Sequence, residues 1–261
     1  MILVPAAVPG TAPAFRRLID PDLLPSAHGG LIVETLPPGV RIEQHPSRVA
    51  ESVTVVLSGR IRSAGRILGP GEGLYHPPGS AGGLTALPGA PAAILTVRPR
   101  PGTGSPLRTP TPWPPSPARR PEAPRPYAVP LAPPPGGGAA EGAAVPGSAG
   151  TGVHWLASAE TVGARRITVA ASAFAAGGSH GLHRHAGADE FFLLVSGGGR
   201  HLTATGGLHL SRGDLVYLPA GEWHGFRTDR AGPATALHGY LGAPSLERAG
   251  YQLRAALPEA A

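Results

Sequence analysis

Four side chains that can bind a metal ion stand at short, fixed spacings in the second half of the sequence. His183 and His185 are two residues apart, Glu190 follows after a short loop, and His224 comes after a Pro-x-Gly turn. Imidazoles at positions i and i+2 of a β-strand point to the same face. Three imidazoles and one carboxylate suit Fe(II), Mn(II), Ni(II), Cu(II) or Zn(II). We therefore expect one divalent metal ion per chain at these four residues.

This ligand set leaves up to two positions open on an octahedral metal ion. Open positions admit a substrate together with dioxygen, or a metal-bound water. Such open positions are what a catalytic metal ion needs. Glu190 is the candidate catalytic residue, because a carboxylate that leaves the metal can act as a base.

The two segments that carry these residues resemble the two signature motifs of the cupin superfamily. The first motif runs from Gly181 through the His-x-His pair and the glutamate to Gly197. The second has the pattern Gly-x5-Pro-x-Gly-x2-His and runs from Gly213 to His224. All four metal-ligand positions of the family pattern are filled, whereas the usual asparagine four residues after the last histidine is Thr228.

The resemblance implies three classes of function. The leading hypothesis is an oxygenase or dioxygenase of secondary metabolism, with Fe(II) as the metal and a small hydrophobic or aromatic substrate. The alternative is a redox-neutral enzyme similar to polyketide cyclases, which would use the metal as a Lewis acid in cyclisation, isomerisation or decarboxylation. The third is a binding protein without catalysis. The ligand set does not choose among them, because one fold carries many reactions.

The first half of the chain shows similar spacings without the ligands. Glu51 precedes an apolar run and Gly59, and a Gly-x5-Pro-x-Gly pattern follows at Gly71. The positions that correspond to the three histidines hold Gln44, Pro46 and Gly82. His45 and Glu51 alone make a weak metal site, and His76 is one residue away from any ligand position. This half therefore resembles a degenerate cupin, and the whole chain resembles a bicupin with one metal site.

Short apolar runs separated by glycine and proline must position these residues. Such runs are typical of β-sandwiches and barrels. The clearest begin at Leu31, Ser52, Ala93, Arg166, Glu190 and Asp214. The predicted fold is all-β, with two cupin-type (jelly-roll) β-barrels joined by a Pro/Gly-rich linker. Helix is expected only in short pieces, around Phe15–Leu24 and Ser245–Leu253.

The linker is defined by its composition. Residues 99–151 hold 16 prolines and 8 glycines, and we expect that such a stretch neither pairs into a sheet nor continues a helix. The predicted domains are a degenerate barrel at 1–98, the linker at 99–151, the metal-binding barrel at 152–243 and a tail with a short helix at 244–261.

Composition excludes several other classes of protein. The 261 residues include no cysteine and no lysine, so cysteine nucleophiles, disulfides, thiolate zinc sites and lysine Schiff bases are absent. Half of the net charge of +6 lies in the linker, which contains 5 arginines and 2 acidic residues. Neither flanking part carries a basic stripe, so the charge does not predict nucleic-acid binding. No apolar run reaches the ~20 residues of a membrane span. We expect a cytoplasmic protein, and the resemblance implies homodimer formation.

The predicted cavity around the metal is largely apolar. An inward-facing Tyr217 or Trp223 would favour an aromatic substrate, but the sequence does not fix which faces of the strands point inward. Arg184 stands between two inward histidines and should point away from the metal. Arg200 and Arg212 are expected in solvent, so no arginine is assured for binding a small dicarboxylate such as oxalate. His180, His201 and His209 receive no role.

Overall fold

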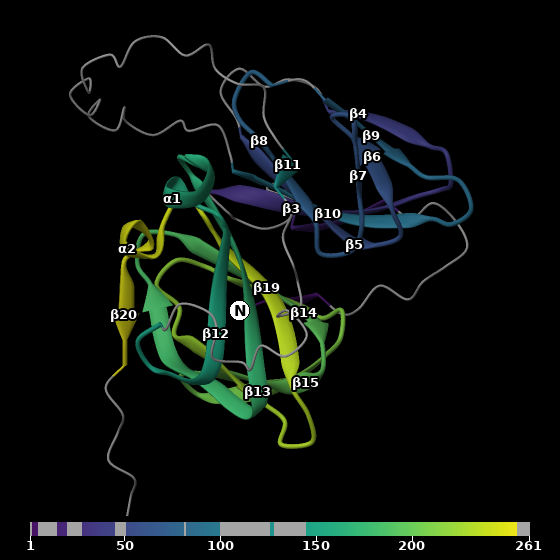
Figure 1. Ribbon diagram of the computed structural model, residues 1–261. Helices are drawn as coiled ribbons and strands as arrows, with labels where there is room; N and C mark the ends of the chain where they lie inside the picture. Colours follow the sequence, from purple (N-terminus) through teal and green to yellow (C-terminus); the bar gives the residue numbers. More distant parts are fainter. Residues whose placement is uncertain are drawn as a thin grey trace, which may run out of the picture.

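The computed structural model describes residues 2–4, 15–19, 28–44, 51–80, 82–99, 126–127 and 145–254. Within these ranges the chain is nearly all β-strand, and its two helices, α1 (Ala159–Val162) and α2 (Leu246–Ala249), have four residues each. Figure 1 shows two groups of strands, one from each half of the sequence, except that the first strand, β1 (Ile2–Val4), joins the C-terminal group. The prediction of an all-β fold is confirmed.

Two antiparallel sheets form the N-terminal half. Leu36, Val56, Ile61, Leu84 and Ile94 belong to the apolar core that they enclose. The larger sheet has the order β11 (Pro126–Tyr127), β8 (Gly73–His76), β5 (Ser52–Ser58), β10 (Ala92–Pro99), β3 (Gly29–Leu36) and β2 (Phe15–Ile19). The smaller sheet has the order β4 (Arg41–Gln44), β9 (Gly82–Ala86), β6 (Ile61–Ser63) and β7 (Arg66–Leu68).

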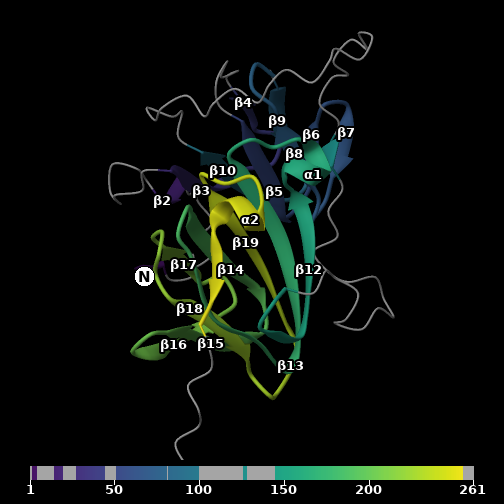
Figure 2. The ribbon, with the colours of Figure 1, turned by 90° about the vertical axis from the view of Figure 1, so that its left-hand side faces the viewer.

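A single ten-stranded sheet, curled on itself, forms the C-terminal half (Figure 2). Its main path is β1 (Ile2–Val4), β17 (Leu215–Leu218), β14 (Asp189–Ser196), β19 (Ala234–Leu241), β13 (Ile167–His185), β18 (His224–Thr228), β15 (Gly198–Thr203) and β16 (Gly206–Ser211). Off this path, β12 (Ser148–Ala157) and β20 (Tyr251–Leu253) both pair with β13.

The curl arises in β13, which has 19 residues and changes partner along its length. Its first part, up to Phe174, pairs with β19, and its last part, from Ser179 to His183, pairs with β18. Between these parts Gly177 has φ +71°, a left-handed conformation that glycine adopts at little cost. The bend carries the end of β13, with both of its predicted ligands, across to β18.

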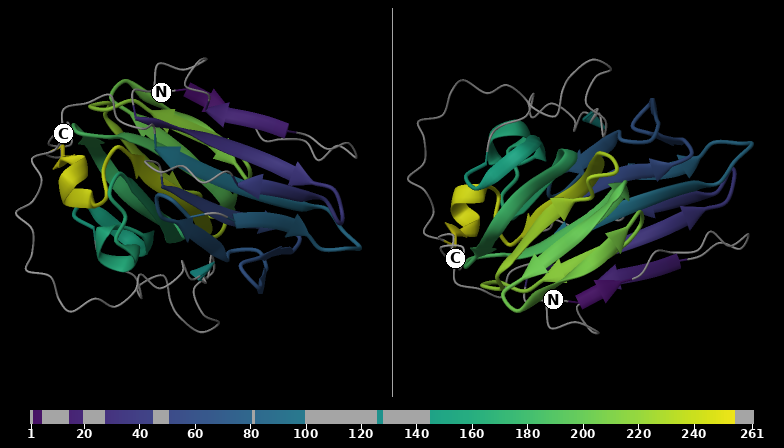
Figure 3. Two further views of the ribbon diagram at one scale, coloured as in Figure 1. Left: turned by 90° about the horizontal axis from the view of Figure 1, so that it is seen from above. Right: turned by 90° about the horizontal axis from the view of Figure 1, so that it is seen from below.

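The two halves share one hydrophobic core. It joins Val53, Val55 and Leu95 of the N-terminal half to Ile167 and Phe191 of the C-terminal half. The larger N-terminal sheet therefore packs on the outer face of the curled sheet, which Figure 3 shows from above and below as overlapping layers. The central strands β14 and β17 of the curled sheet are buried on both faces, which explains why they are continuous apolar runs.

Alternation along β14 separates these two environments. Phe191 and Leu193 point to the shared core, whereas Phe192 and Leu194 belong to the core inside the curl. Glu190 is on the same face as Phe192, because side chains two residues apart on a strand share a face. The strand therefore directs the predicted carboxylate ligand into the curl.

Two expectations about local structure were wrong. A helix was predicted around Phe15–Leu24, but Phe15–Ile19 is a strand paired with β3. A short isolated helix is only marginally stable. Pairing with the open edge of β3 instead gives the backbone N–H and C=O groups of Phe15–Ile19 hydrogen-bond partners. The linker was expected not to pair into a sheet, yet Pro126–Tyr127 pairs with β8, where proline is tolerated at the sheet edge. The rest of the linker up to residue 144 lies outside the described residues.

The predicted C-terminal helix is present but short. Helix α2 begins after Ser245, whose side chain accepts a hydrogen bond from the backbone N–H of Arg248, and ends at Gly250. The chain then continues as β20 on the edge of β13. In the described part of the chain, neither helix has the length and apolar character needed to cross a membrane.

Candidate metal centre

Three strands bring the four predicted ligands together. His183 and His185 lie at the end of β13, Glu190 lies at the start of β14, and His224 begins β18. His183 and His224 are directly paired across β13 and β18. All four side chains are buried, with 2–4% of their surface exposed. Their ligand atoms lie within 4.8 Å of one another.

Backbone carbonyls orient two of the imidazoles. Nδ1 of His183 lies 2.8 Å from the carbonyl oxygen of Gly181, and Nδ1 of His224 lies 2.8 Å from that of Glu222. A carbonyl oxygen only accepts, so Nδ1 carries the proton and donates in both rings. Nε2 of His183 then keeps its lone pair, which is the arrangement typical of metal-binding histidine, whereas Nε2 of His224 shares a proton with Glu190 that a metal ion would replace.

Glu190 is the centre of the group. Its Oε2 lies 2.9 Å from Nε2 of His224 and 3.0 Å from Nε2 of His185. The contact with His185 lacks the alignment that a hydrogen bond requires, so both buried ring nitrogens of His185 have no hydrogen-bond partner. Buried polar atoms without a partner are rare in folded proteins. A cation bound between these groups would give Nε2 of His185 a partner.

The charges of the site also favour a cation. Burial by itself would raise the pKa of Glu190, but the neighbouring charge of His224 and the contacts with both imidazoles outweigh it and hold this pKa well below its usual range. Burial would lower the pKa of His224, but the charge of Glu190 and their hydrogen bond raise it. Burial holds the pKa of His183 well below its usual value, so this imidazole is neutral. A buried carboxylate among imidazoles fits a divalent metal ion.

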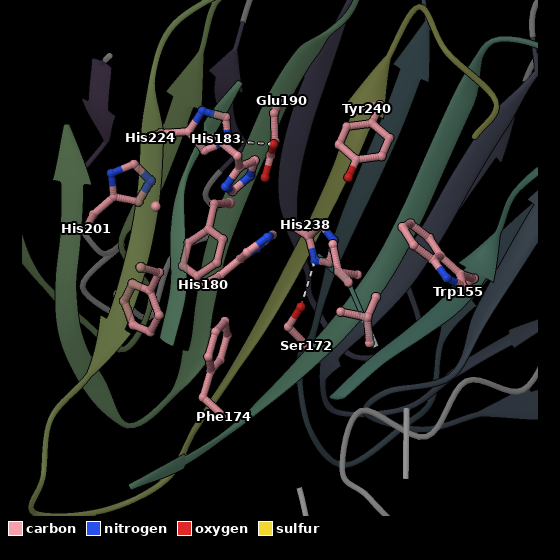
Figure 4. Close-up of a pocket in the computed structure, with 15 residues that line it drawn as sticks. Trp155, Ser172, Phe174, His180, His183, Glu190, His201, His224, His238 and Tyr240 are labelled. Atoms are coloured by element: carbon pink, nitrogen blue, oxygen red, sulfur yellow. Dashed lines mark hydrogen bonds and ion pairs between the residues drawn. The ribbon is translucent and has the colours of Figure 1, made fainter. Parts of the chain in front are cut away.

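A small cavity opens beside the group. Five aromatic side chains give it apolar walls (Figure 4), namely Trp155, Phe174, Phe192, Phe226 and Tyr240. Glu190, His183 and His224 also line it, and no arginine is among its described lining residues. The predicted apolar cavity is therefore present, although neither Tyr217 nor Trp223 lines it.

Tyr217 and Trp223, which would favour an aromatic substrate if they faced inward, lie elsewhere. Tyr217 belongs to the shared core of the two halves, where its hydroxyl donates to Oδ2 of Asp189 at 2.7 Å. Trp223 stacks beside Arg184, whose guanidinium carbon lies 4.8 Å from the ring centre. Arg184 also donates to Gln252 at 2.9 Å, so it is directed away from the metal ligands as expected. Arg200 and Arg212 are exposed, also as expected.

The other histidines have different surroundings. His180 and His201 line the cavity. His209 lies on the surface, where Nε2 is 3.2 Å from Oδ2 of Asp229. Sequence reasoning missed His238, which lines the cavity from β19. The available signal was alternation, because His238 shares its strand face with Tyr240.

Among its described residues, the N-terminal half adds none to the cluster of ligands. Glu51 instead accepts hydrogen bonds from the backbone N–H groups of Arg165 and Arg166 and from the hydroxyl of Tyr75. His76 is largely buried, and burial lowers its pKa to about 4. His45, considered with Glu51 as a weak site, lies outside the described residues. Glu51 is thus a contact between the two halves.

Comparisons with known proteins agree with this geometry. Residues 172–240, which contain all four proposed ligands, match the family model described as Cupin domain. The C-terminal half is similar to a cupin domain. The match does not extend to the N-terminal half, so its description as a degenerate cupin stays a prediction. No match was found among curated proteins.

Solved structures of bacterial enzymes share the fold. A mutant of Bacillus subtilis oxalate decarboxylase has a TM-score of 0.60 and 17% identity, and the alignment covers 88% of this chain and 73% of that chain. A Bacillus subtilis oxalate decarboxylase studied for its Mn(II) centres has a TM-score of 0.60 and 18% identity, with 92% of this chain and 74% of that chain covered. At this identity, the likeness shows a shared fold.

Proposed function

We propose that this protein is a metal-dependent cupin enzyme that acts on a small, uncharged aromatic or hydrophobic compound, with oxygenase chemistry as the leading reaction class. One observation carries the proposal. The ligand atoms of His183, His185, Glu190 and His224 converge, and all of these residues except His185 line a cavity that is otherwise lined mainly by aromatic side chains. The similarity to metal-containing cupins supports the enzyme class.

The cavity favours an uncharged substrate. Glu190 already places a negative charge beside it, and its described lining residues include no arginine, while the chain has no lysine. A bound metal ion could pair with one carboxylate of a small dicarboxylate, but no cationic side chain among the described lining residues would pair with the other, and burying an unpaired charge is costly. We therefore propose that oxalate, the substrate of the structural relatives, is not turned over here.

The side chains of the site have separable roles in this proposal. Phe174, Phe192 and Phe226 pack against one another, with ring centres 4.9–6.4 Å apart, and form an apolar wall that excludes water from the reacting atoms. Tyr240 lies 4.4 Å from the His185 ring, centre to centre. Burial holds the pKa of Tyr240 well above its usual value, so its hydroxyl stays protonated as a hydrogen-bond donor.

Glu190 is the proposed catalytic residue. Its carboxylate contacts the imidazoles of His185 and His224, so a proton that it accepts from a substrate stays within a hydrogen-bonded group. A bound divalent metal would supply Lewis-acid polarisation of a substrate oxygen and, with a redox-active ion such as Fe(II), reaction with dioxygen.

A redox-neutral reaction is the second candidate. The cavity contains three further imidazoles outside the ligand set, those of His180, His201 and His238. Burial lowers the pKa of His180 to about 4 and that of His201 to about 3, so both are neutral near pH 7. Neutral imidazoles can donate or accept hydrogen bonds and so hold a substrate in position for a cyclisation, isomerisation or decarboxylation at the metal.

Oxygen uptake distinguishes the two candidates. Iron-loaded protein should consume dioxygen only when a suitable member of a panel of small phenols and aromatic ketones is added, and His224→Ala should reduce this uptake to background. Oxalate should give neither uptake nor carbon dioxide. Product formation without dioxygen by zinc-loaded protein would instead establish the redox-neutral reaction. Turnover of oxalate would contradict the proposed substrate class.

A further inference from the structure

A buried polar pair lies inside the cavity apart from the metal ligands. His238 on β19 and Ser172 on β13 are 8% and 4% exposed, and both line the cavity. Nδ1 of His238 lies 3.2 Å from Oγ of Ser172. Figure 4 shows this pair separated from the group formed by Glu190, His183 and His224. Neither residue belongs to the proposed ligand set.

The strand register places this pair beyond the metal centre. Tyr240 is paired with Glu190 across β19 and β14, and His238 is paired with Phe192. His238 is therefore two residues further along the sheet than Glu190, which is a distance of roughly 7 Å. The edge of Trp155 packs near the His238 ring, with ring centres 6.2 Å apart. A flat substrate between the phenylalanine wall and Trp155 would extend from the metal ligands towards His238.

The pair leaves one ring atom for a ligand. Ser172 occupies Nδ1 of His238, so Nε2 is the nitrogen that can contact a bound molecule. The serine hydroxyl can donate to Nδ1 or accept from it, so Nε2 can present either an N–H group or a lone pair. Burial lowers the pKa of His238, which keeps the imidazole uncharged and suited to a neutral hydroxyl or carbonyl oxygen.

The two other imidazoles of the cavity are less suited to this role. Nε2 of His180 lies 3.1 Å from the hydroxyl of Tyr251, and its ring stacks on His183 with centres 4.0 Å apart. The Nδ1 atom of His201 is fully buried without a partner. Of these three imidazoles, only that of His238 has its Nδ1 held by Ser172 and also lies at the end of the cavity remote from the metal ligands.

We propose that His238, positioned by Ser172, determines specificity by hydrogen bonding to an uncharged oxygen at the end of the substrate remote from the metal. This inference rests on the proposed function and narrows it. The substrate class becomes a flat aromatic compound with oxygen functions at two opposite ends. One end faces the metal ligands, and the other faces Nε2 of His238.

Two probes that differ in one group test this inference. Benzene-1,4-diol has a hydroxyl where 4-methylphenol has a methyl group of similar size. Titration calorimetry with zinc-loaded protein measures binding without oxidation. Wild-type protein should bind the diol about tenfold more tightly, the effect of one hydrogen bond in a dry site. His238→Leu should remove this preference, whereas His238→Gln, which keeps a donor and an acceptor, should retain part of it.

Two further variants complete the test. Ser172→Ala should reduce the preference, because Nδ1 loses the partner that holds the ring. His209→Ala, which removes a surface imidazole, should leave it unchanged. Every variant should bind zinc like the wild type, which separates specificity from loss of the metal site. A preference that persists in His238→Leu, or equal binding of both probes by the wild type, would overturn this inference alone. If the wild type bound neither probe, the proposed substrate class would be overturned as well.

Discussion

Glu190→Gln is expected to lose most of the thermal stabilisation that a divalent metal gives the wild-type protein. A ligand at about 1,000 times its Kd stabilises the folded state by about 4 kcal/mol. For a chain of this size, that corresponds to a rise in Tm of roughly 8–16 °C. The amide keeps the shape of the side chain but has no charge to attract the cation. Thermal unfolding with and without added zinc or manganese measures the difference.

The metal-free proteins provide the control for this experiment. Without metal, Glu190 is stabilised by His224, so the charged pair contributes stability over a limited pH range. Because folding lowers the pKa of Glu190, its carboxylate stabilises the folded protein at pH values above the usual carboxyl pKa. This stability is lost as the pH falls. Because folding raises the pKa of His224, its imidazolium stabilises the folded protein at pH values below the usual imidazole pKa. This stability is lost as the pH rises.

The difference in stability between the metal-free wild type and metal-free Glu190→Gln should therefore be largest between about pH 4.5 and 6.5, in favour of the wild type. Outside this range, the stability of the two metal-free proteins should converge. An equal rise in Tm on metal addition for both proteins would show that Glu190 is not a ligand.

Glu51→Ala is expected to destabilise the protein by about 3 kcal/mol or more, because it leaves several hydrogen-bond donors without a partner. The carboxylate of Glu51 is 3% exposed. It accepts from the backbone N–H groups of Arg165 at 3.0 Å and Arg166 at 2.6 Å, and from the hydroxyl of Tyr75 at 2.6 Å. These bonds join the N-terminal half to the segment just before β13. Urea unfolding of the metal-loaded protein measures the loss.

Glu72 offers a matched control. Its carboxylate accepts one hydrogen bond, from the backbone N–H of Gly69 at 2.7 Å, within a single turn of the same half. Glu72→Ala should cost about 1 kcal/mol, and Glu51→Gln should cost less than Glu51→Ala because it retains an acceptor. If Glu51→Ala is as stable as Glu72→Ala, the hydrogen bonds of Glu51 do not hold the halves together.

The metal ligands could be predicted because their arrangement depends on local geometry. His183 and His185 share a face of one strand whatever that strand packs against. The turn before His224 similarly sets where β18 begins. The sequence therefore carried enough information to select four residues that the structure brings within 4.8 Å of one another.

The walls of the cavity could not be predicted in the same way. Both faces of β14 and β17 are buried, so their apolar runs do not reveal which side points inward. Tyr217 consequently lies in the shared core rather than in the cavity. Alternation puts His238 on the same strand face as Tyr240, but whether that face points into the cavity depends on the pairing of β19 with β13 and β14. Such pairings join residues far apart in the sequence.

Glu51 illustrates the same limit in the first half. Its spacing matches the glutamate position of the second half, which predicted at most a weak metal site. Its partners Arg165 and Arg166 stand 114 and 115 residues later. A contact at this separation is set by how the sheets pack, which no local motif encodes. The strand at Phe15–Ile19 was missed for a similar reason, since the edge of β3 determines its conformation.

Metal content per chain tests the central claim most directly. Elemental analysis of freshly purified wild-type protein should find about one equivalent of a divalent transition metal. His183→Ala should reduce this to background, and His209→Ala, which changes an exposed histidine, should retain it. Iron would favour the oxygenase reaction, and zinc would favour the redox-neutral one. A wild-type metal content no higher than that of His183→Ala, even after incubation with iron, manganese or zinc, would contradict the assignment of a metal centre to these four residues.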